Sequence, residues 1–418
     1  MTDRLAQVSA GTFRAVQDSR GRRLRVCSIA YTFYHSDARV MRYNKSLAAR
    51  GDAVDVITLR EPGQPRIATS DGVTVIGVQS RNVNERSQFS YLFRILLFFV
   101  RAMLVVSWRQ LKFRYDVVHV HSVPDFLVFT AWLPKLMGTK LILDIHDLLP
   151  ELYSSKFGVH PESVIFKLLL AVERASTAFS DHVITANELW QVKLVGRSVT
   201  AEKATALLNF PDRSVFHPRG RTRTDDKFIM IYPGTLNWHQ GLDIAIEAFA
   251  KIRDKALNAE FHIYGVGPSL PTLMKLVERF GVQDRVVFKG MLPLHEIALV
   301  MENSDLGVVP KRKNSFGNEA FSTKTLEFMA LGVPVIVSDT KIDSYYFSDS
   351  VVRFFRGGDP EDLAEAMLEL ITDRQARDSL KHNGLRFVQA NCWDVKQTLY
   401  LQLIDSLCQC ATEVRTAR

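Results

Sequence analysis

The residues best suited to chemistry lie between Asp305 and Thr340, and their types suit a phosphorylated ligand. Glu319 and Glu327 stand eight residues apart, and both can accept hydrogen bonds from sugar hydroxyls. Carboxylates near phosphates are unfavourable on charge alone, so the combination indicates a ligand that carries a diol beside a diphosphate. The alternative is a helix whose early acid suits the helix dipole, next to a solvated basic loop. Four basic residues accompany the two acids: Lys311, Arg312, Lys313 and Lys324.

The pattern around these residues predicts a strand, a loop, a helix and a second strand. The apolar run before Pro310 predicts a buried strand. Ser322 or Thr323 can cap the helix that follows, Gly332 can end it, and residues 335–337 predict the next strand. The loop then lies at the carboxyl end of a parallel strand, where open α/β sheets bind ligands. The N–H groups at the helix start attract anions.

The rest of the chain repeats this alternation, which predicts an α/β fold of two Rossmann-like domains facing each other across a cleft. We expect a polar basic tail at 1–24, an N-terminal domain at 25–212 and a charged linker at 213–227. A C-terminal domain at 228–390 and a helix at 391–418 that crosses back to the first domain complete the chain. The first βαβ unit lacks the G-x-G-x-x-G of dinucleotide binders.

Two loops of the N-terminal domain are candidates for a ligand site. The loop at 31–39 follows the first strand and contains His35 and Arg39, although a plain surface connection is the alternative. A histidine with acids at the carboxyl end of a strand is typical of a cleft, whereas a lone histidine is more often structural. The strand at 140–144 is followed by such a group: His146, Asp147 and Glu151.

The composition is that of an ordinary soluble protein, with 418 residues, 47% apolar and 23% charged. Four cysteines show no metal or disulfide spacing, which favours a reduced cytosolic compartment. Residues 1–24 lack the apolar core of a signal peptide. Residues 1–210 hold 27 basic and 18 acidic residues, a net charge of +9, against −1 for the remainder. The N-terminal half is therefore expected to face a membrane surface, a phosphorylated substrate or nucleic acid.

The segment at 86–114 is basic, aromatic and free of acids. At 100° per residue its basic side chains fall within one arc of a helix, which predicts a helix lying in a membrane interface. Phe98, Phe99 and Trp108 are expected to enter the headgroup boundary. The alternative is a buried crossover helix with a solvated edge. No uncharged apolar run approaches the roughly 18 residues of a membrane span. The basic residues of the arc are Arg94, Arg101, Arg109 and Lys112.

Motifs in both domains carry a resemblance to a known family. Those of the C-terminal domain are Gly234 with Gly241-Leu242, Gly265-Val-Gly-Pro268, Val287-Phe-Lys-Gly290, and the pair Glu319 and Glu327 followed by Gly332-Val-Pro-Val-Ile-Val. They resemble the retaining glycosyltransferases of family 4, which have the GT-B fold, and the resemblance covers nearly the whole chain from about Arg25. Residues 144–151 and 322–330 resemble the branch of bacterial surface-polysaccharide enzymes.

The resemblance implies that the N-terminal domain binds the acceptor, with His35 and Arg39 as candidates. The C-terminal domain would bind a nucleotide diphosphate-sugar without a metal or cofactor. It implies that Glu319 holds the donor sugar, that Glu327 holds the ribose and that His146 lies across the cleft against the sugar. The diphosphate and the base would contact the remaining donor residues: Gly234, Thr235, Gln240, Gly290, Leu292, Lys311, Lys324 and Thr325.

The sequence therefore predicts a retaining glycosyltransferase of polysaccharide biosynthesis, cytoplasmic and peripheral at the inner face of the membrane. Its acceptor would be a membrane-linked glycan precursor, on a polyprenyl diphosphate carrier. Thr235 and Gln240 stand where the family usually has basic residues. One alternative is therefore an inactive relative that binds nucleotide sugar or scaffolds a membrane assembly. A nucleotide-sugar epimerase is another, while nucleic-acid binding has the charge but no motif.

Overall fold

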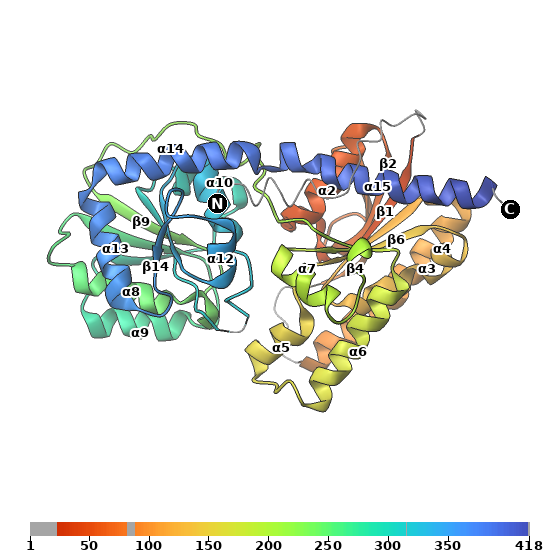
Figure 1. The fold of residues 1–418 in the computed structure, drawn as a ribbon, viewed down its shortest axis with the longest axis horizontal. Helices are drawn as coiled ribbons and strands as arrows, with labels where there is room; N and C mark the ends of the chain where they lie inside the picture. Colours follow the sequence, from red (N-terminus) through yellow and green to blue (C-terminus); the bar gives the residue numbers. More distant parts are fainter. Residues whose placement is uncertain (1–22, 82–87, 315, 417–418) are drawn as a thin grey trace. The chain divides into compact units, whose positions relative to one another are not determined.

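The computed structural model describes residues 23–81, 88–314 and 316–416, with side chains for all of these except 88–90 and 410–416. They form two compact units (Figure 1). One, the C-terminal domain, is Phe210–Lys396. The other, the N-terminal domain, comprises the described residues up to Asn209 and the chain from Gln397 onward. Each is an α/β unit around a largely parallel sheet, as the sequence predicts.

The N-terminal domain contains an eight-stranded sheet in the order β3-β4-β2-β1-β5-β6-β7-β8. Neighbouring strands are parallel except β3 and β4. The chain runs outward from β1 to β2 and β4, then returns to β5 on the other side of β1. The carboxyl ends of β1 and β5 therefore adjoin at a switch point, where such sheets bind ligands. The strands are β1 (Arg25–Phe33), β2 (Ala53–Arg60), β3 (Ile67–Ser70), β4 (Val73–Ser80), β5 (Val117–His121), β6 (Lys140–Ile145), β7 (His182–Thr185) and β8 (Ala204–Ala206).

The helices of this domain cover its sheet and begin or end at residues that suit helix termini. Asp37 accepts a hydrogen bond from the N–H of Val40 at the start of α2, and Gly51 ends that helix in the left-handed conformation. The segments are η1 (Tyr34–Ser36), α2 (Ala38–Arg50), α3 (Gln88–Phe113), η2 (Asp125–Ala131), α4 (Trp132–Leu136), α5 (Leu149–Phe157), α6 (Val164–Phe179), α7 (Glu188–Val195) and η3 (Ala201–Lys203).

The last helix, α15 (Trp393–Thr416), packs on the N-terminal domain from Gln397 onward. Tyr400 is buried there, with its ring centroid 4.4 Å from that of Tyr43. Asp405 forms an ion pair of 2.7 Å with Arg50. The predicted return of the C-terminal helix is therefore present.

The C-terminal domain contains a six-stranded parallel sheet in the order β11-β10-β9-β12-β13-β14. Its switch point lies between β9 and β12, so the loops after these two strands are the expected ligand loops. The strands are β9 (Phe228–Pro233), β10 (Ala259–Tyr264), β11 (Val286–Gly290), β12 (Leu306–Val309), β13 (Val335–Ser338) and β14 (Arg353–Phe355). The helical segments are η4 (Trp238–Gln240), α8 (Leu242–Ile252), α9 (Leu270–Phe280), α10 (Leu294–Glu302), α11 (Thr323–Leu331), α12 (Lys341–Tyr346), α13 (Pro360–Thr372) and α14 (Arg374–Ala390).

Candidate functional site

The loops after β9 and β12 are joined closely at the switch point of the C-terminal sheet. The N–H of Arg312 donates to the carbonyl of His239 over 3.0 Å, and its Nε donates to the carbonyl of Trp238 over 3.1 Å. A Cβ on Gly241 would lie 1.9 Å from the carbonyl oxygen of Pro310. The approach of the two loops therefore requires glycine at that position.

Gly234 brings the first loop against Lys324 at the start of α11. Its φ is +148°, a conformation that other residues rarely adopt. A Cβ there would lie 2.3 Å from Cε and 2.9 Å from Nζ of Lys324. The ammonium of Lys324 therefore lies directly over the backbone of the glycine-containing loop.

The start of α11 presents groups that suit an anion. Burial lowers the pKa of Lys324, and the carboxylate of Glu327 one turn later opposes that shift. In the described part of the chain, no residue accepts a hydrogen bond from this ammonium. Ser322 precedes the helix without capping it through its side chain, and its hydroxyl and that of Thr325 are buried without hydrogen-bond partners. A cation, free hydroxyls and a helix N-terminus together suit an anionic ligand.

The other three basic residues of this region are matched by acids. Lys311, 3% exposed, places Nζ 2.8 Å from Asp343 and 2.7 Å from the carbonyl of Ala320. We expected Lys311 to bind the donor, but its buried ammonium is instead paired with the carboxylate of Asp343. A buried ammonium needs such a partner, because an unpaired buried charge is strongly destabilising. Arg312 pairs with Asp243, and Lys313 pairs with Asp339 over 2.9 Å. Of the four basic residues, Lys324 is the one with no acid within ion-pair distance among the described residues.

The two acids of the predicted pair lie on either side of the start of α11. Glu319 is partly buried in the loop, with its carboxylate 3.6 Å from Nζ of Lys341. Glu327 lies within α11 and is also partly buried. Both residues therefore lie near the start of α11 in the sequence, and their contact with a donor stays a prediction.

The remaining predicted donor residues lie at the ends of adjacent strands or in the loops that follow. The N–H of Gly265 donates to the carbonyl of Gly290 over 2.6 Å, and a Cβ on Gly265 would overlap the carbonyl oxygen of Gly234. These contacts bring the ends of β9, β10 and β11 together. Thr235 is exposed, Leu292 is partly exposed, and the side-chain oxygen of Gln240 is buried without a hydrogen-bond partner.

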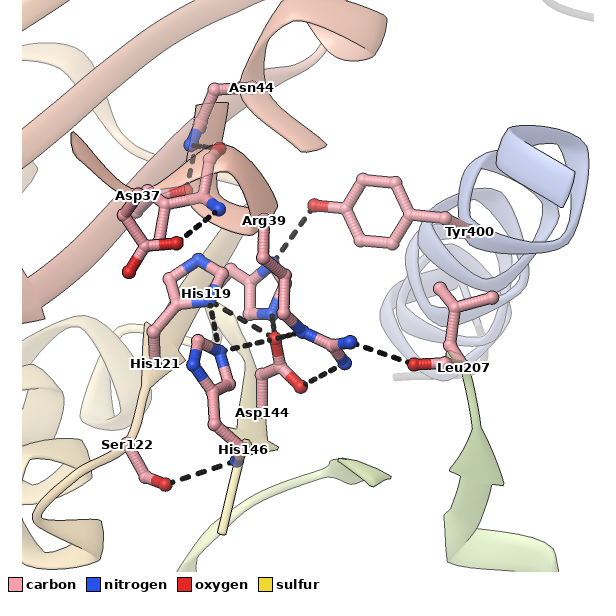
Figure 2. A network of polar contacts seen from close by, with 12 residues as sticks. Asp37, Arg39, Asn44, His119, His121, Ser122, Asp144, His146, Leu207 and Tyr400 are labelled. Carbon is pink, nitrogen blue, oxygen red and sulfur yellow. Dashed lines mark hydrogen bonds and ion pairs between the residues drawn. The ribbon is translucent and has the colours of Figure 1, made fainter. Parts of the chain in front are cut away.

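A second site lies at the switch point of the N-terminal sheet, around the buried carboxylate of Asp144 (Figure 2). Nε and Nη2 of Arg39 donate to Oδ2 and Oδ1 of Asp144 over 2.9 and 2.7 Å, and Nη1 donates to the carbonyl of Leu207 over 2.8 Å. We expected Arg39 to bind an acceptor, but its guanidinium is buried and engaged by Asp144. His35 is exposed on η1.

Three histidines surround the same carboxylate. His121 places Nδ1 3.1 Å from Oδ2 of Asp144, and His146 places Nε2 2.9 Å from that oxygen. His119 lies behind His121 and places Nδ1 3.0 Å from the hydroxyl of Tyr400 on α15. Burial lowers the pKa of both His119 and His121, so both are neutral at neutral pH. Burial alone would favour a protonated Asp144, but the Arg39 guanidinium holds its pKa well below the ordinary value.

Among the described residues, one group of side chains has the spacing of metal ligands, and it lies in this cluster. His119, His121 and Asp144 offer ligand atoms that all lie within 4.8 Å of one another. Arg39 already donates to both oxygens of Asp144, and a cation would have to displace or approach its positive charge. The donor set therefore fits an imidazole–carboxylate network better than a metal centre.

The sequence interpretation named His146, which lies in this cluster, but it named neither His121 nor the contacts of Asp144. The available signal was the spacing of His119 and His121, because residues two apart on a strand point to the same face. Both stand on β5, beside β6, which contains Asp144. That β5 and β6 are neighbours follows from the order of strands in the sheet. Hydrophobic periodicity predicts strands but not their order.

Helix α3 buries one face and exposes another that is apolar. We had expected Phe98 and Arg109 to contact a membrane. Phe98 is instead fully buried, and Arg109 donates to Asp55 over 2.6 Å, so neither side chain is available for that contact. Trp108 is 58% exposed and Phe93 is 67% exposed. By length and composition, Tyr91–Phe113 is long and apolar enough to cross a membrane. The exposed apolar side chains of α3 include Phe93, Leu96, Val100, Leu104, Trp108 and Leu111.

Comparison with known proteins assigns both domains. Residues 36–209 match the family described as Glycosyl transferase 4-like domain, and residues 216–387 match Glycosyl transferases group 1. The chain is 26% identical over 157 residues to the putative colanic acid biosynthesis glycosyltransferase WcaL of Escherichia coli (strain K12). That match spans 37% of this chain and only 39% of WcaL.

Two solved structures share the fold over most of their length. Sucrose-phosphate synthase (tll1590) from Thermosynechococcus elongatus gives a TM-score of 0.74 at 20% identity, covering 92% of this chain and all of that one. Anabaena Alr3699/HepE in complex with UDP-glucose gives a TM-score of 0.65 at 14% identity, covering 94% of this chain and all of that one. With its 4-like domain followed by its group 1 domain on two parallel sheets, the chain belongs to the glycosyltransferases of GT-B type.

Proposed function

We propose that the protein transfers a sugar, with retention of configuration, from a nucleoside diphosphate-sugar to a membrane-linked glycan precursor of polysaccharide biosynthesis. The observation that carries the donor class is the ammonium of Lys324, which lies over Gly234 at the uncapped start of α11. The structure of HepE is a complex with UDP-glucose, and WcaL is named as a putative colanic acid biosynthesis glycosyltransferase. Both support this class of substrate for the present chain.

The main electrostatic task of the reaction is to stabilise the departing diphosphate. In our proposal Lys324, the N–H groups of α11 and the hydroxyls of Ser322 and Thr325 do so. Glu327 accepts hydrogen bonds from the ribose, and Glu319 accepts them from the donor sugar. We propose that no metal takes part, so transfer should survive a chelator. Activity that is lost with a chelator and restored by magnesium or manganese would overturn that part.

In our proposal the acceptor attacks the face from which the diphosphate departs, so that a single displacement retains the anomeric configuration. The acceptor oxygen forms the new bond to the anomeric carbon as the bond from that carbon to the diphosphate oxygen breaks. The proton of the acceptor hydroxyl passes to the departing diphosphate. Analysis of the anomeric configuration of the product by NMR tests this step, and an inverted product would refute it.

The membrane-linked acceptor is supported by the surface of α3. This helix presents an apolar face, and Arg101 and Lys112 are exposed on it. Residues 88–114 contain no acid, which suits an anionic lipid surface. We therefore propose that the protein is peripheral at the cytoplasmic face of a membrane, and that a polyprenyl diphosphate carries the acceptor.

A calorimetric binding screen of nucleoside diphosphates and their sugars tests the donor site. One compound should bind, and Lys324→Ala should weaken its binding by about 1.5–3 kcal/mol, the contribution of a charge-assisted hydrogen bond. Lys275→Ala, an exposed lysine on α9, is the matched control and should bind normally. Equal binding by the Lys324 variant and the parent would show that the site is misplaced.

A transfer assay with the donor found in that screen and a lipid extract then separates an enzyme from an inactive relative. Thr235 and Gln240 stand at positions where two further cations would help the leaving group. Sugar incorporated into lipid, or slow hydrolysis of the donor, identifies an active enzyme. Tight donor binding with neither reaction, in extracts that contain acceptor for a known transferase, identifies the inactive binding protein.

A further inference from the structure

The exposed apolar surface of the N-terminal domain extends beyond α3, because α6 also exposes apolar side chains along its length. Val164 is 81% exposed and Leu168 is 62% exposed. At 100° per residue these two fall within one narrow arc, opposite the buried face of the helix. The same arc contains three exposed alanines: Ala171, Ala175 and Ala178.

A further apolar row is presented by η2 and the start of α4. In a 3₁₀-helix, side chains three positions apart lie in line with one another. Phe126 and Phe129 are the two residues of η2 that are not buried. Trp132, which is 45% exposed, follows three positions later, and Leu136 is 74% exposed on α4. These side chains therefore form a row on the outside of the domain.

The row on η2 connects α3 to α6, because η2 packs against both helices. The ring centroid of Phe126 lies 6.0 Å from that of Phe99 on α3, and the centroid of Phe129 lies 5.1 Å from that of Phe179 on α6. The connections from β4 to β5, from β5 to β6 and from β6 to β7 all cross the sheet in one direction, opposite to that from β1 to β2. Right-handed crossovers then place α3, η2 and α6 on one face of the sheet, away from α2 (Figure 1). We call the exposed rows of α3, η2, α4 and α6 the α3–α6 surface.

The α3–α6 surface is too apolar to be ordinary solvent-exposed surface. Soluble monomers rarely expose one apolar patch larger than a few hundred Å². Five of the large apolar side chains here are each more than half exposed: Leu104, Trp108, Leu136, Val164 and Leu168. The surface therefore indicates a partner.

The charges around this surface favour a lipid partner. Helices α3 and α4 contain no acid, and the acids of η2 and α6, Asp125 and Glu173, are each only 1% exposed. Exposed apolar and aromatic side chains with basic neighbours suit the interface of an anionic bilayer. Protein interfaces, in contrast, are depleted in lysine. The exposed basic residues on α3 and α6 are Arg101, Lys112, Lys167 and Arg174.

We infer that the whole α3–α6 surface lies in the headgroup region of an anionic bilayer, so that α6 and the row on η2 and α4 bind lipid together with α3. This inference rests on the membrane contact in the proposed function and extends that contact from one helix to a layer of helices. It also orients the N-terminal domain. The face of the sheet that α3 and α6 cover rests on the membrane, and the face that α2 covers is turned away from it.

Flotation of the full-length protein with vesicles of phosphatidylcholine and phosphatidylglycerol in equal parts tests the role of α6. Ile165→Glu combined with Leu168→Glu should lower the partition coefficient at least about tenfold, because apolar burial is lost and two negative charges face anionic lipid. The matched control, Leu257→Glu with Met274→Glu, makes the same charge change at exposed apolar residues of the C-terminal domain and should bind as the parent does. Parent-like binding by the α6 variant, or an equal loss in the control, would overturn the inference.

The row on η2 and α4 is tested by a conservative change that leaves the fold and the charge intact. Bromine in the acyl chains of the vesicles quenches the fluorescence of tryptophans that reach the lipid. Trp132→Phe should lower the quenched part of the signal, as should Trp108→Phe on α3. If Trp132→Phe leaves the quenched signal unchanged, Trp132 does not reach the lipid and the inference is wrong.

These outcomes separate the inference from the proposed function. If the parent binds vesicles and only glutamates on α3 abolish binding, the membrane contact of the proposed function stands and its extension to α6 fails. If the parent ignores vesicles of either composition, anionic or pure phosphatidylcholine, both fail, while calorimetry with the donor still reports on the transferase. A parent that is dimeric without lipid and an α6 variant that is monomeric, with no vesicle binding by either, would identify a second copy as the partner and refute the inference.

Discussion

Replacing Gly234 by alanine separates the role of Lys324 from the role of the loop that lies beneath it. The new Cβ would lie 2.3 Å from Cε of Lys324. Because the clashing atoms belong to the end of a flexible side chain, the clash can be relieved by movement of that side chain without a shift of the backbone. The ammonium would then leave the start of α11. Loss of a charge-assisted hydrogen bond to the donor diphosphate costs about 1.5–3 kcal/mol, which raises the Kd roughly 10- to 150-fold. A φ of +148° adds strain of about 1–3 kcal/mol, which lowers stability without touching the ligand.

Calorimetry with the donor and thermal unfolding of the ligand-free protein measure the two effects separately. Gly220→Ala is the control for strain, because Gly220 has a φ of +97° and an added Cβ there would meet nothing within 4 Å. That variant should lose stability but bind the donor normally. In a Lys324→Ala background, Gly234→Ala should no longer weaken donor binding, since the group it displaces is already absent.

Two results would refute this reasoning. One is normal donor affinity in Gly234→Ala, which would mean that the diphosphate does not need Lys324 where the structure places it. The other is a loss of donor affinity on adding Gly234→Ala to Lys324→Ala that is as large as the loss caused by Gly234→Ala in the parent. Gly234 would then act through its own backbone, and the approach of the phosphates to that backbone would be the dominant contact.

Three further predictions concern the ribose, the membrane and pH. Glu327→Ala should weaken binding of the donor by about 1.5–3 kcal/mol in calorimetry, and unchanged affinity would remove the carboxylate from the site. The protein should sediment with anionic vesicles at low salt and be partly released at high salt. Changing Leu104 and Trp108 to glutamate should abolish sedimentation while donor binding persists, and vesicle binding by this variant would exclude the exposed face of α3. Burial, with the nearby charge of Glu173, raises the pKa of Asp125 to about 7. The folded state then binds more protons than the unfolded state between about pH 4 and 7, so stability falls as pH rises through that window. Asp125→Asn should accordingly raise the Tm at pH 8 but not at pH 4, and a gain that is equal at both values would contradict the shift.

The alternation of strands and helices was readable from the sequence because burial of both sheet faces leaves continuous apolar runs. The edge hairpin of β3 and β4 was not predicted. Its signal was present in Asp71-Gly72, which connects the two strands with φ values of 49° and 77°. Aspartate followed by glycine between strands is a strong indicator of a tight hairpin. The short, polar β3 gives almost no apolar alternation of its own, so the turn was the better guide.

The charges around the donor loop show what sequence spacing cannot supply. Lys311 and Asp343 are thirty-two positions apart, and only the adjacency of their loops brings them within 2.8 Å. Lys324 was predicted correctly as a residue of the helix start, because a helix boundary is a local feature. Which basic residues remain unmatched is a property of the tertiary structure.

Lys324 has no acidic partner among the described residues, which favours a functional donor site over one that has lost its ligand. This observation leads to a last prediction. The ammonium of Lys324 is partly buried beside unpartnered hydroxyls, and its Nζ lies 5.5 Å from the centroid of the Tyr232 ring. A ring contact offsets only part of the cost of desolvation, and no described residue adds a hydrogen bond. Groups of this kind are usual where a ligand completes the pairing. Lys324→Met keeps the length of the side chain and removes the charge, so it should raise the Tm of the ligand-free protein while weakening donor binding by about 1.5–3 kcal/mol. Thermal unfolding with and without the nucleotide sugar measures both effects. If Lys324→Met instead destabilises the ligand-free protein, the ammonium serves the fold, and the anion site must be sought elsewhere.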